Sequence, residues 1–346
     1  VIPRYKTKRG FHVRRKAGWD THGLPVEIET EKQLGFTQKS QIEEYGIAAF
    51  NEKCKESVWK YVNEWKDFTR RIGYWVDLDD AYVTYYPNYI ESVWNLVKGI
   101  SDKKLLYRDY KVLPWCPRCG TALSSHELAQ GYQDVKDLSV YVKFKLDADS
   151  TRKLCGQDAE NVYLLAWTTT PWTLPGNVAL AVGEDIDYVK VAKEGETLIL
   201  AKERLAIFGK EHEIKEEIKG KDLVGLSYEP LYDFLHDRKV SPDEQEAWSA
   251  SLEKAWKVYP ASFVNTTEGT GIVHTAVMYG QDDFELGNAI GLPKYHLVDE
   301  TGRFIEGLGF LSGRFVREQD ENGKPTLAVD IIDDLKKRNL FFNQES

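Results

Sequence analysis

The chain has no apolar run that approaches the length of a membrane span, and its start carries no signal peptide or transit peptide. Cysteine is scarce: there are four in 346 residues, and two of them share one Cys-x-x-Cys. This scarcity argues against a disulfide framework and favours a reducing compartment. We therefore expect a cytoplasmic protein without a membrane segment.

Signatures of covalent catalysis are missing as well. The sequence contains no Gly-x-Ser-x-Gly elbow, and Cys54 and Cys155 stand outside any motif. Internal repeats and low-complexity tracts are also absent. A hydrolytic site in this chain would therefore use a positioned water and not a serine or cysteine nucleophile.

What is present describes a large globular protein, with 42% hydrophobic and 29% charged residues. A chain of this length is expected to form two or more domains. The formal net charge of -9 argues against a general nucleic-acid coat. One basic cluster near the start is either a solvated loop, which we favour, or a contact for an anionic ligand. It comprises Arg4, Lys6, Lys8, Arg9, Arg14, Arg15 and Lys16.

Residues from about 40 to 104 have the periodicity of helices. Apolar and aromatic residues recur there at spacings of three and four, and Pro87 with Asn88 suits the start of the second helical stretch. We expect the apolar stripe to form core, as is usual for an amphipathic helix. Its members are Phe50, Val58, Tyr61, Val62, Trp65, Phe68, Ile90, Val93, Trp94 and Val97.

After about residue 134 the pattern becomes that of strands. Residues 139–146 alternate as a half-buried strand should, and residues 162–167 predict a buried strand. A charged segment at 210–221 and a polar insertion with a helix at 241–257 interrupt this region, and an amphipathic helix is expected at 328–339 with basic residues at its C-terminal end. Further strands are predicted at 178–182, 186–192, 197–201 and 269–275.

Two segments concentrate polar groups beside predicted strands. The first, WTTTPWTLPGN at 167–177, combines four hydroxyls and an amide with two prolines that restrict the backbone. Thr-rich strand ends also cap ordinary turns, so this segment alone does not decide between site and turn.

The second segment is GTGIVHTA at 269–276, followed by GQDDF at 280–284. Its glycines let the backbone approach a ligand closely, and His274 is placed to line a pocket. Asp282 and Asp283 are suited to hold an ammonium group. The structural alternatives are a satisfied internal histidine and an aspartate pair that caps a helix.

Cys116 and Cys119 have the spacing of a zinc knuckle. A redox role is the weaker alternative, because Pro117 and Arg118 lie in a turn and not at a helix start. Only two ligands are adjacent. His126 is a possible third, although residues 124–127 read more like the start of a helix.

Together these segments resemble the editing domain of class I aminoacyl-tRNA synthetases, and specifically that of the isoleucyl branch. The matching stretches are the two polar segments, the strand LVGLSYEPL at 223–231 and the loop GWDTHGLPVE at 18–27. The resemblance covers residues from about 4 to 340. In place of the proline that often follows His-Thr-Ala in this family, the chain has Val277.

The resemblance implies an α/β fold: a partial class I Rossmann catalytic region with a helical continuation, followed by a β-rich α/β editing domain. The implied divisions are 1–108 for the catalytic part, 109–133 for a zinc-knuckle connector, 134–335 for the editing domain and 336–346 for the return toward the catalytic domain.

The resemblance also implies roles for individual residues. Asp283 would anchor the α-ammonium group of a misattached amino acid, and His274 would wall the side-chain pocket. Trp167 and Thr275 would also bind the substrate. The 3′-terminal ribose and the hydrolytic water would be bound by Thr168, Thr169, Thr170 and Asn177. In the loop at 18–27, Asp20 and His22 would recognise isoleucine and its adenylate.

The family's activity is to activate isoleucine with ATP and Mg²⁺, charge the tRNA for isoleucine, and hydrolyse that tRNA when it carries valine. The chain lacks the His-x-Gly-His and Lys-Met-Ser-Lys-Ser signatures, so we expect an internal fragment that does not form adenylate alone. Zinc is possible, but the family's second cysteine pair would fall after Ser346. We expect a monomer. The alternatives are a valyl- or leucyl-type editing fragment and a non-enzymatic module that binds tRNA or zinc.

Overall fold

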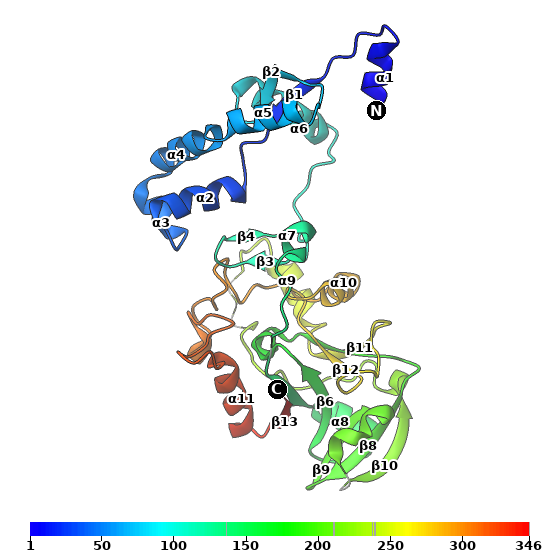
Figure 1. The fold of residues 1–346 in the computed structure, drawn as a ribbon. Coiled ribbons are helices and arrows are strands. Elements are labelled where there is room, and N and C mark those ends of the chain that lie inside the picture. The colour runs from blue at the N-terminus through cyan, green and yellow to red at the C-terminus, as the bar shows by residue number, and fades with distance from the viewer. Residues whose placement is uncertain (136, 210–211, 237, 239, 346) are drawn as a thin grey trace. The chain divides into compact units, whose positions relative to one another are not determined.

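The computed structural model describes residues 1–135, 137–209, 212–236, 238 and 240–345. The chain divides into two compact units, which we describe separately. The smaller consists of Val1–Lys111 with Trp115–Ala122, and the larger of Val112–Pro114 with Leu123–Ser346 (Figure 1). None of the helices in the described ranges has the length and apolarity needed to cross a bilayer. The four-part domain division expected above stays a prediction.

The smaller unit is mainly helical and contains one short parallel strand pair, β1 (Lys16–Trp19) with β2 (Asp77–Val83). A two-residue hairpin, β3 (Trp115–Cys116) with β4 (Thr121–Ala122), carries the Cys-x-x-Cys turn. The helices are α1 (Ile2–Lys8), α2 (Leu24–Leu34), α3 (Ser40–Tyr45), α4 (Ile47–Trp59), α5 (Val62–Arg71) and α6 (Pro87–Asp102).

The helical prediction for residues 40–104 is confirmed except at β2. Helix α6 begins at Pro87 as expected. Strand β2 was missed because three of its seven residues are aspartates, which obscure the apolar alternation of a strand. One of these, Asp80, pairs with Arg14 at 2.7 Å and with Lys16 at 2.9 Å, so charge as well as backbone pairing connects β2 to β1.

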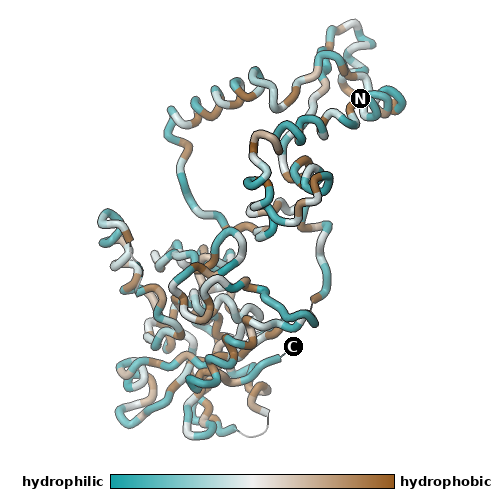
Figure 2. Tube along the Cα trace, turned by 90° about the vertical axis from the view of Figure 1, so that its left-hand side faces the viewer, coloured by the Kyte–Doolittle hydropathy of each residue, from teal (hydrophilic) through white to brown (hydrophobic). Residues whose placement is uncertain are grey.

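The prediction that the apolar stripe forms core is wrong for most of its members. Phe50 is buried, but Trp65 on α5 is 57% exposed and Trp94 on α6 is 73% exposed. Figure 2 shows apolar positions recurring along the coiled, helical stretches of the trace. The periodicity is therefore real, but no described residues cover these faces of α5 and α6.

The basic cluster is solvated, although residues 2–8 form helix α1 and not a loop.

The larger unit is built on a nine-stranded sheet with the order β10-β8-β9-β6-β12-β7-β11, in which β5 pairs with β6 and with β13. The strands are β5 (Ser139–Lys145), β6 (Val162–Thr168), β7 (Ala179–Val182), β8 (Asp187–Lys193), β9 (Glu196–Ala201), β10 (Glu213–Lys219), β11 (Lys257–Pro260), β12 (Ile272–Thr275) and β13 (Phe341–Glu345). Six of the seven strands predicted in this region are confirmed, with small shifts at their ends. The seventh prediction, at 223–231, is wrong, because this segment makes only isolated bridges at Ser227 and Tyr228.

Helices and short 3₁₀ turns connect these strands. The α-helices are α7 (Ser125–Ala129), α8 (Ala148–Cys155), α9 (Gln245–Leu252), α10 (Gln281–Ile290) and α11 (Leu327–Lys337), and the 3₁₀ turns are η1 (Pro171–Gly176), η2 (Lys202–Phe208), η3 (Gly220–Asp222) and η4 (Gly309–Leu311). The helices predicted within 241–257 and at 328–339 correspond to α9 and α11 and are confirmed.

Three strands of this sheet were not predicted: β10, β11 and β13. Within the charged segment 210–221, residues 210 and 211 lie outside the described ranges, and residues 213–219 form β10 at the sheet edge, antiparallel to β8. Its charged side chains are compatible with an edge, where one face and one side meet solvent. Residues 341–345, which were assigned to a connecting segment, form β13 and pair antiparallel with β5.

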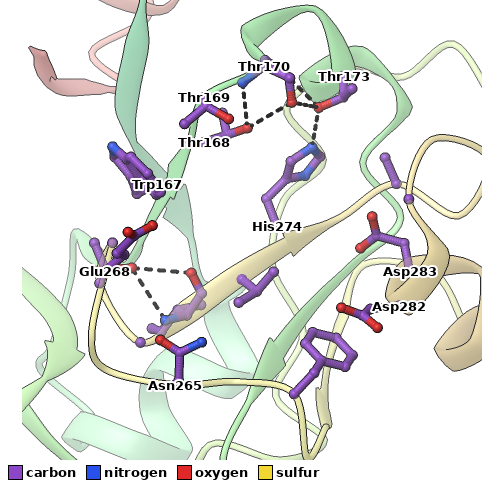
Figure 3. Close-up of a pocket in the computed structure, with 18 of the residues that line it drawn as sticks. Trp167, Thr168, Thr169, Thr170, Thr173, Asn265, Glu268, His274, Asp282 and Asp283 are labelled. Atoms are coloured by element: carbon purple, nitrogen blue, oxygen red, sulfur yellow. Dashed lines mark hydrogen bonds between the residues drawn. The ribbon is translucent and has the colours of Figure 1, made fainter. Parts of the chain in front are cut away.

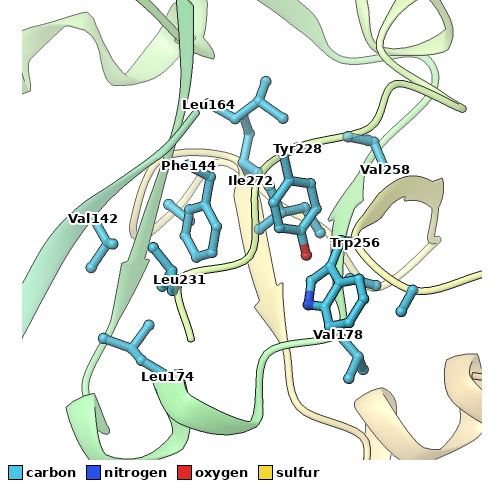
Figure 4. Close-up of a cluster of buried hydrophobic side chains, with 14 of the residues drawn as sticks. Val142, Phe144, Leu164, Leu174, Val178, Tyr228, Leu231, Trp256, Val258 and Ile272 are labelled. Atoms are coloured by element: carbon cyan, nitrogen blue, oxygen red, sulfur yellow. The ribbon is translucent and has the colours of Figure 1, made fainter. Parts of the chain in front are cut away.

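Strand β5 is buried on both faces, and not on one as predicted. Val140, Val142 and Phe144 point into the larger hydrophobic cluster, part of which Figure 4 shows, whereas Tyr141 belongs to a smaller cluster. The alternation was therefore read correctly, but both sides of the sheet are covered. On the second side, the ammonium group of Lys143 is buried against Glu196 at 2.7 Å.

Strand β6 changes partners along its length. One edge pairs with β5 as far as Thr168, while the other pairs in parallel with β9 at residues 162–164 and with β12 at Trp167. The segment that leads into β12 bridges to the end of β9, where the Ala201 N–H donates to the Thr270 carbonyl at 2.8 Å. The threonine segment thus begins where the partner strands of β6 change.

Candidate functional site

A pocket of about 390 Å³ opens at the C-terminal end of β6. Its walls come from the end of β6 with η1, from residues 263–274 and from residues 276–283 at the start of α10. The two polar segments found in the sequence therefore face one cavity. Figure 3 shows Trp167 and Glu268 on one side of it and Asp282 and Asp283 on the other.

Local chemistry explains how the threonine segment turns into the pocket wall. Pro171 occupies the first position of η1, where a missing N–H costs nothing. The turn is closed by the Thr173 N–H, which donates to the Thr170 carbonyl at 2.9 Å. After η1, the Val178 N–H donates to the Thr275 carbonyl at 3.0 Å, which joins this segment to β12.

The hydroxyl groups of Thr168, Thr170 and Thr173 form one chain, with successive Oγ1 atoms 3.2 Å apart (Figure 3). Thr173 Oγ1 donates to the Thr170 carbonyl at 2.9 Å. A hydroxyl has one proton, so Thr173 accepts in its other contacts and Thr170 donates to it. Thr173 thus has both lone pairs occupied, by Thr170 and by His274, and Thr168 and Thr170 are the members that can offer lone pairs to a ligand. Thr169 is exposed, and its hydroxyl has no hydrogen-bond partner within the described residues.

His274 is a neutral imidazole. Burial lowers its pKa to about 4. Asn177 Nδ2 lies 2.9 Å from the Ala179 carbonyl, which can only accept, and 2.8 Å from His274 Nδ1. Nδ1 is therefore an acceptor and the single ring proton lies on Nε2, which donates to Thr173 Oγ1 at 3.0 Å.

Asn177 does not lie where the prediction placed it. The residues that line the pocket include the three threonines but not Asn177, which is buried behind His274. Its Oδ1 accepts from the Tyr228 hydroxyl at 2.6 Å, and its carbonyl accepts from the Trp256 indole at 3.2 Å. The amide is thus engaged by protein groups, among them His274.

Asp283 lines the pocket from the first turn of α10. Burial and the neighbouring charge of Asp282 raise the pKa of Asp283 to about 7. Asp282 itself is exposed. Gly280 leaves room for this carboxyl group, because a Cβ at that position would lie 2.3 Å from Asp283 Oδ2.

The charges around the cavity have one sign. Glu268, Asp282 and Asp283 line it, and the described lining residues include no lysine or arginine. A cavity of this kind favours a ligand with an ammonium group and disfavours one that must bury a phosphate.

Trp167 and Thr275 differ in their access to the pocket. Trp167 lines it, and a Cβ at Gly269 would lie 3.1 Å from the indole ring. Thr275 is fully buried and is not among the lining residues. Neither the Trp167 indole N–H nor the Thr275 hydroxyl has a hydrogen-bond partner among the described residues.

The sequence analysis did not assign roles to Thr173, Glu268 or Tyr228. Thr173 carried a signal, because it follows Thr170 by three residues within a proline-bounded turn, a spacing that places both on one side of a 3₁₀ helix. Tyr228 carried none, since it lies 51 residues from Asn177.

Val277 is buried and packs on α10, where a Cβ at Gly287 would lie 2.6 Å from its Cγ2.

Asp20 and His22 belong to the smaller unit, on an exposed turn after β1, and are not part of this pocket. The His22 N–H donates to Asp20 Oδ1 at 3.3 Å. Nothing in the structure tests their predicted role in recognising isoleucine and the adenylate.

Cys116 and Cys119 do not complete a zinc site with the described residues. The Cys119 N–H donates to Cys116 Sγ at 3.3 Å, and no third histidine, cysteine or carboxylate joins them in the described part of the chain. His126 instead follows Ser124, whose side chain forms a capping box at the start of α7. Tetrahedral zinc requires four ligands, so we derive no metal chemistry here.

Comparisons with known proteins assign the chain to a family. Residues 1–296 match the tRNA synthetases class I (I, L, M and V). The chain is 51% identical over 320 residues to an isoleucine–tRNA ligase of Clostridium acetobutylicum, covering 92% of the chain and 29% of that protein. It is 46% identical over all 346 residues to the isoleucine–tRNA ligase of Clostridium tetani, covering 30% of that protein.

Solved structures resemble the chain more distantly. The crystal structure of GlLeuRS-CP1 matches 60% of this chain and 99% of its own with 16% identity and a TM-score of 0.44, which is too low to carry an argument. The chain spans less than a third of the length of the curated relatives. The family match alone covers most of its length, and the chain therefore belongs to the class I tRNA synthetases (I, L, M and V).

Proposed function

We propose that the larger unit is the editing site of an isoleucine–tRNA ligase and hydrolyses valine from the tRNA for isoleucine. The observation that carries the proposal is the pairing, across one cavity, of a threonine hydroxyl chain with a partly buried carboxyl group that suits an ammonium. The identities of 46–51% to proteins named isoleucine–tRNA ligase support this branch over a valyl or leucyl enzyme.

The proposed reaction is attack of water on the ester that joins the amino acid to the terminal ribose. Asp283 in its ionised form binds the α-ammonium group and holds the ester carbonyl near the threonines. The lone pairs of Thr168 and Thr170 accept hydrogen bonds from the attacking water or a ribose hydroxyl, and the unengaged Thr169 hydroxyl is a donor for the developing oxyanion. The leaving ribose oxygen takes up a proton.

Selectivity in this proposal comes from exclusion by size. Valine is smaller than isoleucine by one methylene, and a pocket distinguishes the two by only about 1–3 kcal/mol, a problem for which isoleucyl enzymes are themselves the standard example. If a second cavity admits valine and excludes isoleucine, its selectivity multiplies that of the site where isoleucine is first bound. His274, held from both ring nitrogens, is a rigid wall for that purpose.

The activity of the complete protein is also a proposal. We propose that it activates isoleucine with ATP and Mg²⁺ and charges the tRNA for isoleucine as a cytoplasmic monomer. The two curated relatives named above support the ligase activity. A non-enzymatic module that binds tRNA remains the alternative, which deacylation of mischarged tRNA would rule out.

The direct test is Asp283→Ala in the complete enzyme, with hydrolysis of valyl-tRNA for isoleucine as the measurement. We expect a loss on the order of 100-fold. The ammonium group would lose the carboxylate of Asp283, and the remaining acidic residues of the cavity wall, Asp282 and Glu268, are exposed. Asp282→Ala is the matched control and should retain most activity. Unchanged hydrolysis in Asp283→Ala would refute the assignment.

A further inference from the structure

Tyr228 stands at the far end of the hydrogen-bond chain that leads to the pocket. It is buried in the larger hydrophobic cluster, close to Phe144 and Trp256 (Figure 4). Burial raises the pKa of its phenol well above the ordinary value, so the group keeps its proton. Within the described residues its hydroxyl has one hydrogen-bond partner, Asn177 Oδ1 at 2.6 Å.

This contact and the bond from Asn177 Nδ2 to the Ala179 carbonyl, which can only accept, together set the direction of the later hydrogen bonds. The Tyr228 hydroxyl donates to Asn177 Oδ1, Asn177 Nδ2 donates to His274 Nδ1, and His274 Nε2 donates to Thr173 Oγ1. The reverse arrangement requires the Asn177 amide to turn over. Its oxygen would then face the Ala179 carbonyl, and the ring proton of His274 would move to Nδ1.

The reverse arrangement would change what the pocket offers to a ligand. His274 Nε2 would become an acceptor, and Thr173 would have to donate to it and release the Thr170 carbonyl. The Thr170 carbonyl would lose the Thr173 hydroxyl and keep only the Thr173 N–H. The orientation of one buried amide thus determines whether the Thr173 hydroxyl, at the end of the threonine chain, accepts from His274 or donates to it.

The rings themselves are held in place by Phe144. This side chain is fully buried and lies edge-on to Tyr228 at 5.4 Å and stacked on His274 at 6.5 Å between ring centroids. Ring rotation at either position would disturb the packing of Phe144. The rings therefore keep their positions in both arrangements, which differ in the orientation of the Asn177 amide and in which atoms carry the protons.

We propose that Tyr228 is a positioning residue of the editing site, which acts through Asn177 to keep His274 as the tautomer that carries its proton on Nε2. This inference rests on the proposed function for its catalytic consequence. The tautomer itself is a property of the chain and does not depend on which reaction the site performs.

The first experiment measures the tautomer by NMR in the 346-residue chain labelled with ¹⁵N-histidine. The chain has seven histidines, and His274→Gln identifies the signals of His274. At neutral pH we expect a protonated Nε2 and an unprotonated Nδ1 in the native chain. In Tyr228→Phe we expect a second population or averaged shifts of the two ring nitrogens. A native chain protonated on Nδ1 would overturn the proposal.

Two further variants test whether a folding defect explains the change in the His274 signals. Asn177→Asp presents a carboxylate, which has no proton to donate, and should leave His274 with a proton on Nδ1. Tyr232→Phe is the matched control, because it removes a partly buried phenol of the same cluster that donates to Asp334 at 2.9 Å. It should leave the His274 signals unchanged. Equal spectra for Tyr228→Phe and Tyr232→Phe would overturn the proposal.

The second experiment measures deacylation in the complete enzyme. We expect kcat to fall on the order of tenfold in Tyr228→Phe, the effect of about one lost hydrogen bond, with KM nearly unchanged. A changed tautomer with unchanged kcat would overturn the positioning role while leaving the editing function intact. If the native enzyme hydrolyses no valyl-tRNA, the proposed function fails and the tautomer result still stands.

Discussion

Burial favours the neutral form of the two titratable groups that matter most in the pocket. It lowers the pKa of His274 to about 4, so this ring is neutral at physiological pH. Together with Asp282 it raises the pKa of Asp283 to about 7, so this carboxyl group is poised between its two forms. An ammonium group stabilises the ionised form. Ligand binding therefore converts Asp283 to the carboxylate that the proposed reaction needs.

Asp283→Asn is expected to stabilise the free chain at pH 8 by up to about 4 kcal/mol and to have little effect at pH 4. The pKa of Asp283 is about 7 in the folded state against an ordinary 3.8. The unfolded chain therefore loses this proton first as pH rises, and the native chain loses stability between about pH 4 and pH 7. Urea unfolding of both proteins at pH 4, 5.5 and 8 measures the difference.

The neighbouring carboxylate provides the control for this prediction. Asp282 is exposed, so Asp282→Asn should relieve only its repulsion of Asp283 and change stability by less than about 1 kcal/mol. Equal stabilisation by both variants at pH 8 would show that the effect is general charge repulsion and not burial of Asp283.

Gly280→Ala is expected to lower deacylation by the complete enzyme roughly 100-fold without unfolding it, because misplacing a reacting group by about 1 Å has effects of that size. The backbone at Gly280, with φ -145° and ψ 149°, suits alanine. The new Cβ would lie 2.3 Å from Asp283 Oδ2 and displace the carboxyl group. Gly99→Ala, where a Cβ meets nothing within 4 Å, should leave the rate unchanged.

At the scale of elements, the pocket exists because β6 does not keep one neighbour along its length. Pairing with β9 ends after Leu164 and pairing with β12 occurs at Trp167. The segment that precedes β12 fills the opening and provides one wall of the cavity. Its position depends on η2, because the Arg204 guanidinium donates to the carbonyls of Gly269 at 2.7 Å and Thr267 at 3.2 Å.

Arg204→Met should therefore loosen this wall. We expect KM for deacylation to rise about tenfold while kcat changes by less than about twofold, because the charged hydrogen bonds hold a binding surface and not the reacting groups. Steady-state kinetics on mischarged tRNA measures both constants. The control is Lys202→Met on the same turn, which loses an ion pair with Glu217 at 2.7 Å and should leave KM unchanged. A fall confined to kcat would contradict this account.

Elements with regular periodicity were predictable from the sequence, and those whose pattern is dominated by charge were not. Strands β5 and β6 and helix α11 follow their apolar spacing. Strands β2 and β10 carry aspartates, glutamates and lysines because they pair at exposed edges. Backbone pairing stabilises such strands without an apolar face, so no hydrophobic pattern identifies them.

At the scale of the whole molecule, the two units differ in how much apolar surface they bury. Both hydrophobic clusters are formed by residues of the larger unit. The smaller unit buries few apolar side chains and exposes many large ones, on α5 and α6 in particular. Burial of apolar surface is the main source of stability, so the larger unit is the more stable of the two.

Hydrogen exchange should show this difference directly. In the isolated chain we expect the central strands β6, β8 and β9 to exchange at least 100-fold more slowly than α5 and α6, because exchange of core strands requires global opening of their unit. Mass spectrometry of peptic fragments after exchange measures the rates. Equal protection of α5, α6 and the central strands would contradict the prediction.

The sequence by itself determined the strand and helix segments with regular apolar spacing, the turn at Pro171 and the two polar segments that meet at the pocket. These depend on spacing and turn chemistry within about ten neighbouring residues. The tertiary structure alone decided that Asn177 supports His274, that Thr275 is buried away from the cavity and that Tyr228 completes the network. The physical reason is distance along the chain: His274 lies 97 residues from Asn177, and hydrogen-bond partners so far apart are set by packing and not by local pattern.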